Sequence, residues 1–475
     1  MPIRFGTDGW RAVISEEFTF DNVRRLAQAI AHLFRETAGD RPLVAVVGFD
    51  TRFLSDRYAI EVARVLSGNG VSVYLTDVAT PTPVVSFAIT RLKAIGGVMI
   101  TASHNPPRYN GIKLKSAFGG SAPLEECRRV EAYTETMHEM NMMDFDAAQT
   151  QGLIKRFDPR PDYFAHLETL VDRSIIAQHP RRILIDPMYG AGRGYLAHWL
   201  RDAGWDAIEI HGELNPGFGG IHPEPIRKNL DTTAAALTRL NSTAPAFAVI
   251  SDGDADRIGA MNEHAEFVDA HRIFALALNY LVEKRGWRGS VVKTVSTTLM
   301  LDRICRKHGL TWHETPVGFN HIADRMLSED VLIGGEESGG ISIKGHVPEG
   351  DGILLGALLA EIVAWHDKPL YQLVDELQST YGPAHYARRD LRLQRPLSKK
   401  DMVARLVDEA PASIAGVTLR QIKSDDGIKY LLEDDSWLLI RPSGTEPVLR
   451  VYAESSLPER VDQLLQFGEQ IAARA

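Results

Sequence analysis

The sequence predicts a multidomain α/β protein, with three successive α/β units followed by one α+β unit. Two patterns in its 475 residues support this prediction. Up to about residue 380, short apolar runs alternate with longer periodic segments, which is the pattern of β-α-β units with largely parallel sheets. Beyond that point strand-like segments follow one another closely, two of them joined by a short turn, which indicates an antiparallel module. At roughly 100–200 residues per domain, this length accommodates three domains or four.

The same patterns place the individual elements. In the first unit, the helix that follows the first strand has Ser55 as a candidate N-cap and Gly70 as a candidate stop. We expect strands at residues 43–50, 72–77 and 95–103 and a helix at 55–70 in the first unit; strands at 182–186, 208–211 and 246–251 and helices at 190–204 and 231–241 in the second; helices at 271–286 and 297–309 and strands at 290–295 and 331–334 in the third; and strands at 385–394, 417–422, 429–433, 437–441 and 448–453 with helices at 398–408 and 458–473 in the last. The expected domains are residues 1–152, 153–262, 263–380 and 381–475.

Charge and composition exclude several classes of protein. The chain has 53 basic and 62 acidic residues, a net charge of −9, whereas a general nucleic-acid binder carries a basic excess. No apolar run approaches the roughly 18 residues of a membrane helix, and the first residues do not form a secretory signal. Cys127 and Cys305 are too few and too far apart for a disulfide framework or a metal knuckle. We therefore expect a cytoplasmic protein with neither nucleic acid nor membrane as a partner.

The segment TASHNPPRYNG contains the first candidate for chemistry. Ser103 follows an apolar strand, and ligands of α/β folds bind at strand ends. The two prolines after it restrain the backbone, so that the hydroxyl is held in one place. His104 and Lys113 flank the serine, and either side chain can move a proton. No glycine lies two residues to either side, so this is not a nucleophile elbow; a solvated turn is the alternative.

The segment SDGDADRIG predicts a metal site. Asp252, Asp254 and Asp256 alternate, so that in an extended turn they point to one centre, and three carboxylates suit Mg²⁺ or Ca²⁺ better than zinc. Without a cation they would repel one another. Glu263 falls at the twelfth position of an EF-hand loop, but Arg257 occupies the sixth, which requires glycine, and the flanking segments are strand-like. Arg257 can instead contact an anion that bridges to the metal.

Two glycine-containing loops carry groups that recognise a phosphorylated polyol. In GGEESGG, Glu336 and Ser338 can accept from and donate to hydroxyl groups, as a sugar requires; a glycine-rich turn with exposed acids is the alternative. In RPSGTEPVLR, two guanidinium groups, two hydroxyls and a glycine amide match a phosphate dianion, although Glu446 adds like charge and a solvated turn is again the alternative. These phosphate-binding candidates are Arg441, Ser443, Gly444, Thr445 and Arg450.

The four loops lie in four different predicted domains, and small ligands commonly bind at domain junctions. Together they provide a serine, a carboxylate triad, a reader of hydroxyl groups and a phosphate clamp. Phosphoryl transfer on a phosphorylated polyol is the reaction class that uses all four.

The segments FGTDGWR, TASHNP, DGDADR, GGEESGG and RPSGTEP follow one another in this order. In these motifs and over nearly the whole chain, the sequence resembles the α-D-phosphohexomutase family and its phosphoglucomutase/phosphomannomutase branch. The resemblance implies a heart-shaped architecture of four domains, three α/β domains with mixed sheets and a C-terminal α+β domain. It also implies an enzyme that interconverts hexose 1-phosphate and hexose 6-phosphate through a hexose 1,6-bisphosphate, with glucose favoured over mannose. Its partners would be small phosphosugars, and it would be a monomer or a dimer.

The resemblance also implies roles for individual residues. Ser103 would be the phosphoserine, and its phosphate would complete the Mg²⁺ site of Asp252, Asp254 and Asp256. Mg²⁺ and Arg257 would neutralise the transferring group. Glu336 and Ser338 would bind sugar hydroxyls, and Arg11 would approach the active centre. The phosphate that does not react would be clamped by Arg441, Ser443, Gly444, Thr445 and Arg450, and Lys293 would also contact phosphate. His104, Lys113 or His346 would transfer a proton.

One position departs from the family pattern. The segment TPVGFNHI has Asn320 where related sequences commonly have lysine, which removes a positive charge from the third domain. This departure leaves a hexose 1,6-bisphosphate synthase, with a sugar bisphosphate as donor, as an alternative to a mutase. A non-catalytic protein that binds Ca²⁺ or a sugar phosphate is the alternative from another class.

Overall fold

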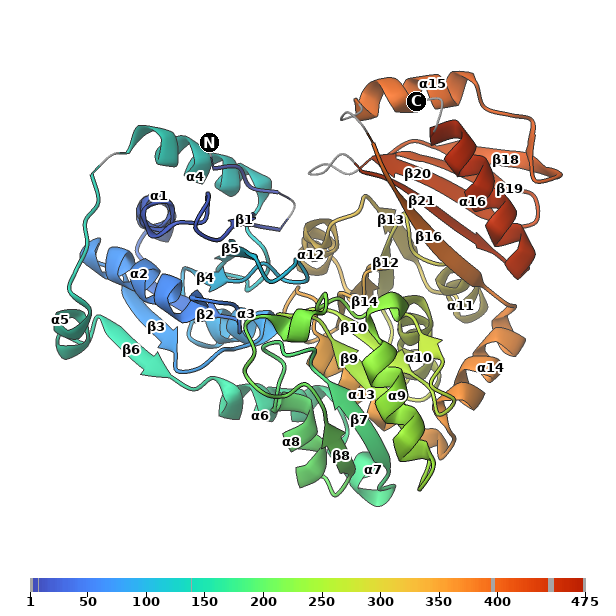
Figure 1. Ribbon diagram of the computed structural model, residues 1–475, viewed down its shortest axis with the longest axis horizontal. Helices are drawn as coiled ribbons and strands as arrows, with labels where there is room; N and C mark the ends of the chain where they lie inside the picture. The colour runs from blue at the N-terminus through green and yellow to red at the C-terminus, as the bar shows by residue number, and fades with distance from the viewer. Residues whose placement is uncertain (1–2, 7, 138, 394–397, 443–447, 473–475) are drawn as a thin grey trace.

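The computed structural model of the chain describes residues 3–6, 8–137, 139–393, 398–442 and 448–472. They form four sheets, which follow one another along the chain. The first and last domains stand as two separate upper lobes in Figure 1, with the second and third domains below and between them. This arrangement confirms the prediction of three α/β domains with mixed sheets and a C-terminal α+β domain.

The first domain has a six-stranded sheet in the order β1-β5-β4-β2-β3-β6. Four strands are parallel, whereas β5 runs antiparallel to both β4 and β1. Its elements are β1 (Trp10–Val13), α1 (Phe20–Ala38), β2 (Val44–Phe49), α2 (Ser55–Gly68), β3 (Ser72–Thr76), α3 (Thr82–Arg91), β4 (Gly96–Ile100), β5 (Tyr109–Ser116), α4 (Leu124–Thr136), α5 (Phe145–Thr150) and β6 (Ile154–Phe157). Val46 packs with α3, and its neighbours Ala45 and Val47 pack with α1 and α2, so both faces of the sheet are covered.

The second domain has a five-stranded sheet in the order β11-β10-β9-β7-β8, in which β7, β8 and β9 are parallel. The aspartate-rich loop connects β9 to the antiparallel strand β10. The elements are α6 (Arg160–Leu170), α7 (Arg173–Gln178), β7 (Arg182–Asp186), α8 (Tyr195–Asp202), β8 (Asp206–Glu209), α9 (Asp231–Asn241), β9 (Ala246–Ser251), β10 (Ile258–Met261) and β11 (Phe267–Val268), with short 3-10 helices at Phe218–Gly220 and Arg227–Asn229.

The third domain has a four-stranded sheet in the order β13-β12-β14-β15, and the sugar-loop candidate connects β14 to the antiparallel β15. The elements are α10 (Ala270–Glu283), β12 (Ser290–Thr294), α11 (Met300–His308), β13 (Trp312–Thr315), α12 (Phe319–Ser328), β14 (Val331–Gly335), β15 (Ile341–Ile343), α13 (Gly352–His366) and α14 (Leu370–Tyr381).

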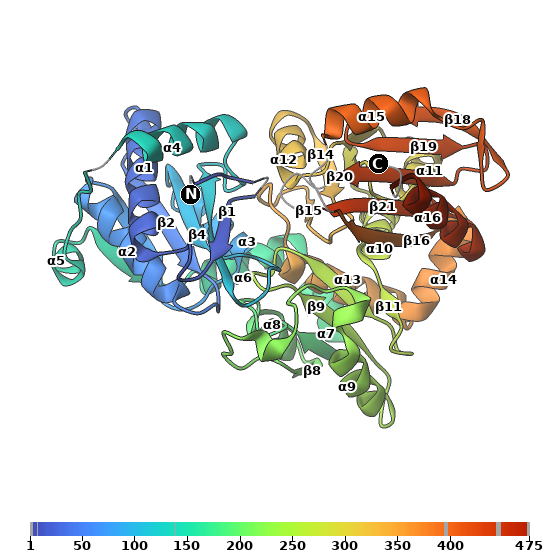
Figure 2. The same ribbon diagram turned by 45° about the horizontal axis from the view of Figure 1, so that its top comes forward.

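The fourth domain has an antiparallel six-stranded sheet in the order β16-β21-β20-β19-β18-β17, packed beside the third domain (Figure 2). Trp437 and Tyr452 of this sheet join Val295 and Leu299 of the third domain in one apolar cluster. The elements are β16 (His385–Arg392), α15 (Lys399–Asp408), β17 (Ser413–Ile414), β18 (Val417–Lys423), β19 (Ile428–Leu432), β20 (Trp437–Pro442), β21 (Val448–Ser455) and α16 (Pro458–Ala472).

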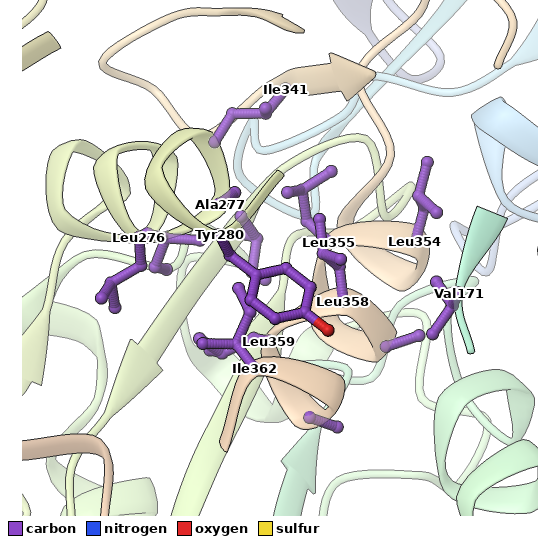
Figure 3. Close-up of a cluster of buried hydrophobic side chains, with 14 of the residues drawn as sticks. Val171, Leu276, Ala277, Tyr280, Ile341, Leu354, Leu355, Leu358, Leu359 and Ile362 are labelled. Carbon is purple, nitrogen blue, oxygen red and sulfur yellow. The ribbon is translucent and has the colours of Figure 1, made fainter. Parts of the chain in front are cut away.

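Helix α13 joins the second and third domains through a common core. Its sequence GILLGALLAEIVAWH is apolar on nearly all sides, which is typical of a helix with no solvent-facing side. Figure 3 shows Leu355, Leu358 and Ile362 of this helix around Tyr280 of α10. Because this core spans both domains, the aspartate-rich loop of one and the sugar-loop candidate of the other are held in a fixed relation.

Several expected elements agree closely with the structure, including the helix at 231–241 and the strand at 246–251. Others are shorter than expected: the strand at 95–103 ends at Ile100, and the helix at 190–204 begins at Tyr195. Ser55 is not an N-cap, because α2 starts at Ser55 and its N-cap position is Leu54, with no side-chain hydrogen bond. Strand β1 and helices α1 and α3 were not expected.

Strand β5 is the most consequential difference. The sequence places Lys113 in a polar loop region, but Lys113 and Lys115 both lie within this strand and are 1% and 0% exposed. Two lysines obscured the strand, because buried lysines occur only where their charge is paired. Lys113 pairs with carboxylates of the aspartate-rich loop, and Lys115 pairs with Glu349.

Candidate active site

Ser103 lies in the turn after β4, with its side chain directed at the aspartate-rich loop of the second domain. The residue is 1% exposed, and its Oγ donates to Asp252 Oδ2 at 3.1 Å and lies 3.3 Å from His104 Nδ1. Its φ of 51° is in the left-handed region, which costs a residue with a Cβ about 1–2 kcal/mol. Backbone strain of this kind persists only where the surroundings impose it, and it clusters at functional sites.

Asp252, Asp254 and Asp256 converge as the sequence predicts. One oxygen from each carboxylate lies within 4.8 Å of the others, and all three residues are buried. The loop approaches Ser103 closely, since a Cβ on Gly253 would lie 2.5 Å from the carbonyl oxygen of Ser103. Burial and then the charges of Asp256 and Asp254 raise the pKa of Asp252 well above its ordinary value.

The donor set fits a hard divalent cation. Among the described residues, Asp254 Oδ1 and Asp256 Oδ1 are buried without a hydrogen-bond partner. Buried carboxylate oxygens are costly unless they are paired or bind a metal. Oxygen-only ligands, with neither histidine nor cysteine in the group, suit Mg²⁺.

Lys113 reaches the same carboxylates from β5. Its Nζ lies 2.7 Å from Asp256 Oδ2 and 3.0 Å from Asp254 Oδ2, and Asp8 Oδ2 is a further 2.7 Å neighbour. Burial alone would lower the pKa of Lys113, but Asp254, Asp256 and Asp8 outweigh it and hold that pKa well above its ordinary value. The lysine therefore stays charged and offsets part of the negative charge of the triad.

Two arginines line the region around the serine. The backbone N–H of Arg257 donates to Asp252 Oδ1 at 3.2 Å, and its guanidinium lies 3.8 Å from Glu224 and 3.9 Å from Asp256. Arg11 of β1 donates to Asn105 Oδ1 at 2.6 Å in the serine turn. Both guanidinium groups are only partly exposed, so water screens their charge less than at the surface. They supply positive charge where an anion would meet the serine.

His104 is the other ionisable neighbour of the serine. Burial, together with the positive charges of Arg257 and Arg11, lowers the pKa of His104 well below its ordinary value. Its imidazole is therefore neutral near pH 7 and has one nitrogen able to accept a proton.

The sugar-loop candidate is tied to the aspartate-rich loop. The N–H of Ile258, which follows Arg257, donates to the carbonyl of Gly339 at 3.1 Å, and a Cβ on Gly339 would lie 2.4 Å from the carbonyl oxygen of Ile258. Glu336 Oε1 accepts from the N–H of Gly318 at 2.9 Å, and burial raises the pKa of Glu336 to about 7 although Arg257 opposes the shift. Ser338 lies in the same turn.

The phosphate-loop candidate is described only at its two ends. Arg441 of β20 and Arg450 of β21 are paired residues of the antiparallel ladder, so their side chains emerge side by side. Arg441 Nε donates to Asp426 Oδ2 at 2.7 Å. The other expected members of this clamp, Ser443, Gly444 and Thr445, lie outside the described residues.

The structure does not bring Lys293 or His346 to the serine. Lys293 Nζ donates to the carbonyl of Thr298 at 3.0 Å and pairs with Asp302, inside the third domain. The ring of His346 lies between Asp351 Oδ2 at 3.0 Å and His166 Nε2 at 3.1 Å. Asp351 caps the N-terminus of α13, so these contacts connect His346 to the packing of domains rather than to Ser103.

This junction gives a pH-dependent stability. Burial and the neighbouring ring of His346 lower the pKa of His166 to about 4, whereas unfolded histidine titrates near 6.5. Between these values the unfolded chain binds a proton that the folded chain does not, so folding stability falls as the pH drops from about 6.5 to 4. After allowance for the partial exposure of His166, we expect this histidine to lower the free energy of unfolding by about 1–2 kcal/mol over that pH range.

Thermal unfolding midpoints of the wild type and His166→Gln, measured across this pH range, test the expectation. The variant should lose less stability on acidification than the wild type. Two curves that run parallel from neutral pH to pH 4 would contradict it.

Several residues at the site were missed by sequence reasoning. Asp8 lies within the motif FGTDGWR, three residues before Arg11, and an acid so close to a candidate site arginine is the signal that the sequence offers. Glu224 contacts Arg257, and Glu337 accepts from Arg388 of β16 at 3.0 Å. Arg52 binds the backbone of the serine turn. Glu337 lies within the motif GGEESGG, whereas no local pattern marks Glu224 or Arg52, whose partners at the site are far away in sequence.

Comparison with known proteins agrees with this geometry. Four domain families match the chain, described as phosphoglucomutase/phosphomannomutase alpha/beta/alpha domains I, II and III, over residues 2–140, 161–265 and 269–381, and as the phosphoglucomutase/phosphomannomutase C-terminal domain, over residues 396–467. A Thermococcus kodakarensis phosphoglucomutase/phosphomannomutase is 31% identical over 473 residues, which cover 99% of this chain and 98% of that protein. A Methanosphaera stadtmanae protein described as a phosphoglucosamine mutase is 30% identical over 471 residues, with 99% and 98% coverage.

A solved structure is also similar over its whole length. It is a protein from Thermus thermophilus described as a phosphomannomutase, with 37% identity and a TM-score of 0.87, and the match covers 100% of this chain and 99% of that one. The fold, the four loops and these relatives define a phosphomutase, an intramolecular phosphotransferase. The chain belongs to the phosphoglucomutase/phosphomannomutase family. Among the described helices, none is long and apolar enough to cross a membrane.

Proposed function

We propose that this protein is a Mg²⁺-dependent phosphohexomutase that interconverts hexose 1-phosphate and hexose 6-phosphate, with glucose as the first substrate and mannose as the second. The reaction would pass through a phosphorylated Ser103 and a hexose 1,6-bisphosphate. The observation that carries the proposal is the meeting of Ser103 Oγ with the buried carboxylate triad, 3.1 Å from Asp252. A nucleophile beside a metal triad and two arginines is the arrangement that phosphoryl transfer requires.

Mg²⁺ would be held by Asp252, Asp254 and Asp256, and it would supply positive charge to the oxygens of the transferring phosphoryl group. Arg257 and Arg11 add fixed positive charge on the protein side of the same group. Since Lys113 stays charged against the triad, it limits the repulsion between the carboxylates and an incoming phosphate.

His104 is the side chain proposed to move the proton of the reacting hydroxyl. His104 is neutral and lies beside Ser103 Oγ, so it can accept a proton there. Lys113 shares this region but keeps its proton against the triad, so its proposed role is to hold positive charge there. The contacts of His346 support a positioning role at the domain junction instead.

The remaining residues would bind the substrate away from the reacting centre. Glu336 and Ser338 would hold sugar hydroxyls, and Arg441 and Arg450, with Ser443, Gly444 and Thr445, would clamp the phosphate that is not reacting. A pair of guanidinium forks recognises a phosphate in either orientation of the sugar. This matters because the bisphosphate must turn over before its second phosphate faces Ser103. Lys293, which the resemblance assigns to phosphate contact, is buried and paired with Asp302, so it has no part in this proposed clamp.

Purified protein with Mg²⁺ and a trace of glucose 1,6-bisphosphate tests the proposal, using glucose, mannose and glucosamine 1-phosphates as substrates. We expect turnover of glucose 1-phosphate and mannose 1-phosphate to the 6-phosphates, with the highest kcat/KM for glucose. Two hydroxyl contacts discriminate by only a few kcal/mol, so dual specificity is expected. No interconversion of any of the three would refute the proposal.

Asn320 keeps bisphosphate synthesis as a second candidate. It stands in the first turn of α12, beside Gly318, whose N–H binds Glu336, and it brings no charge to this wall of the site. Under the same conditions with a sugar bisphosphate donor in excess, a synthase would accumulate glucose 1,6-bisphosphate. A mutase would return only monophosphates.

A further inference from the structure

Arg52 lies in the turn after β2, and all of its side-chain hydrogen-bonding capacity is used. Its Nη2 donates to the carbonyl of Ser103 at 2.5 Å and to that of Asn105 at 2.7 Å. Its Nη1 donates to the carbonyls of Pro106 at 2.9 Å and Tyr109 at 3.0 Å. Four of the five guanidinium N–H groups therefore bind one backbone segment, the serine turn at residues 103–109.

The fifth donor anchors the guanidinium to the sheet. Arg52 Nε pairs with Asp50 Oδ2 at 3.1 Å, and both side chains are 0% exposed. The other oxygen of Asp50 accepts from the N–H of Arg52 at 2.9 Å and from Ser55 Oγ at 2.8 Å. Because Asp50 directly follows β2, which pairs with β4, the anchor is fixed relative to the strand that leads to Ser103.

The serine turn needs such a partner. Ser103 has a left-handed φ of 51°, and a run of carbonyls that point inward cannot bind one another. The fork of an arginine offers several donors in one plane, which a lysine ammonium does not. Without these bonds the buried carbonyl of Ser103 and the partly buried carbonyl of Asn105 would lose their arginine donor, and the turn would relax away from the position that presents Oγ to Asp252.

The same loop is held by the second domain. The guanidinium carbon of Arg52 lies 4.9 Å from the centre of the Phe218 ring. Thr51 Oγ1 donates to the carbonyl of Tyr189 at 2.8 Å. Phe218 and Tyr189 both have left-handed φ values, of 50° and 59°. The backbone of the second domain that contacts Arg52 and Thr51 is therefore also strained. Arg52 thus connects the serine turn of the first domain to the domain that carries the carboxylate triad.

We propose that Arg52 is a positioning residue for phosphoryl transfer, which holds the serine turn so that Ser103 Oγ faces the carboxylate triad. This inference rests on the proposed function of that site. Arg52 touches neither Oγ nor the carboxylates of the triad; it acts through the backbone carbonyls of the turn. It therefore affects the chemical step rather than the binding of hexose phosphate by the third and fourth domains.

Arg52→Lys is the main test, because it keeps the charge and removes the fork. A displacement of about 1 Å at a reacting centre costs about 10²-fold in rate, so we expect kcat for glucose 1-phosphate to fall about 100-fold, with KM within about twofold. Amide hydrogen exchange in residues 101–111 should become at least about tenfold faster, because local opening governs exchange.

The matched control is Arg285→Lys. Arg285 also has a largely buried guanidinium that binds a carboxylate, Glu361, and a backbone carbonyl, that of Leu170, but it lies at the junction of the second and third domains. This variant should be less stable than the wild type, but its kcat and the amide hydrogen-exchange rates of residues 101–111 should be unchanged. Phe218→Leu is a milder variant, which removes the ring beside the guanidinium and should lower kcat about threefold to tenfold.

A kcat of Arg52→Lys within threefold of wild type, unchanged exchange of residues 101–111, or an equal loss of kcat in Arg285→Lys would each overturn the inference. If Arg52→Lys does not fold, Phe218→Leu decides through the same kcat and exchange measurements. If the wild type itself has no mutase activity, the proposed function fails, whereas the exchange comparison still shows whether Arg52 holds the turn.

Discussion

Ser103→Ala is expected to lower mutase kcat by on the order of 10⁴-fold or more while leaving the protein folded. The substitution removes only the Oγ atom, which lies 3.1 Å from Asp252 and 3.3 Å from His104. In the proposed mechanism the phosphoryl group is donated from this atom and returned to it, and no neighbouring side chain can replace it. Steady-state interconversion of glucose 1-phosphate measures the loss, and the thermal unfolding midpoint reports folding.

Ser86→Ala is the matched control. Ser86 is also a buried serine of the first domain, on α3, and its Oγ has no hydrogen-bond partner among the described residues. Its loss should leave kcat unchanged. If Ser103→Ala kept more than about one hundredth of wild-type activity, a phosphoserine mechanism would be contradicted. Such a residual activity would exceed what substrate binding and charge stabilisation alone provide.

Asp254→Asn is expected to weaken Mg²⁺ binding at least about 100-fold and to lower kcat on the order of 10³-fold, because a ligand charge worth several kcal/mol is removed. Asp254 is 0% exposed, and its Oδ1 has no protein partner among the described residues, whereas its Oδ2 binds Thr82 Oγ1 at 2.6 Å and Lys113 at 3.0 Å. Asparagine keeps the shape of the side chain and removes its charge. Calorimetric titration with Mg²⁺ and activity as a function of Mg²⁺ concentration measure the two effects.

Asp186→Asn provides the comparison within the same sheet. Asp186 ends β7 and is 0% exposed, but its oxygens bind His211, Thr233 and the N–H of Met188. We expect a loss of stability and an unchanged Mg²⁺ affinity. An Asp254→Asn variant that binds Mg²⁺ as tightly as the wild type would show that the triad is not the metal site.

Local sequence carries much of this fold because apolar periodicity depends on neighbours only. Helix α9 and strand β9 follow directly from their patterns, and the convergence of Asp252, Asp254 and Asp256 follows from alternation within one turn. The four-domain order follows in the same way, from the change of pattern near residue 380.

Pairing between distant segments could not be predicted in this way. Lys113 is buried in a strand only because Asp254 and Asp256, more than a hundred residues away, neutralise it. Arg52 has no motif of its own, since its partners in the serine turn are backbone carbonyls that any residue would offer. His346 illustrates the converse: a histidine beside a glycine-rich loop suggests proton transfer, but its ring nitrogens face Asp351 and His166 and not Ser103.

Single-turnover transfer from Ser103 tests the central claim most directly. The protein is phosphorylated with labelled glucose 1,6-bisphosphate in the presence of Mg²⁺, the label is located by peptide mass analysis, and unlabelled glucose 1-phosphate is then added. We predict that the label lies on Ser103 and leaves it within one turnover, to appear in newly formed glucose 1,6-bisphosphate. Label on another residue, or label that stays on Ser103 after the hexose phosphate is added, would contradict the account.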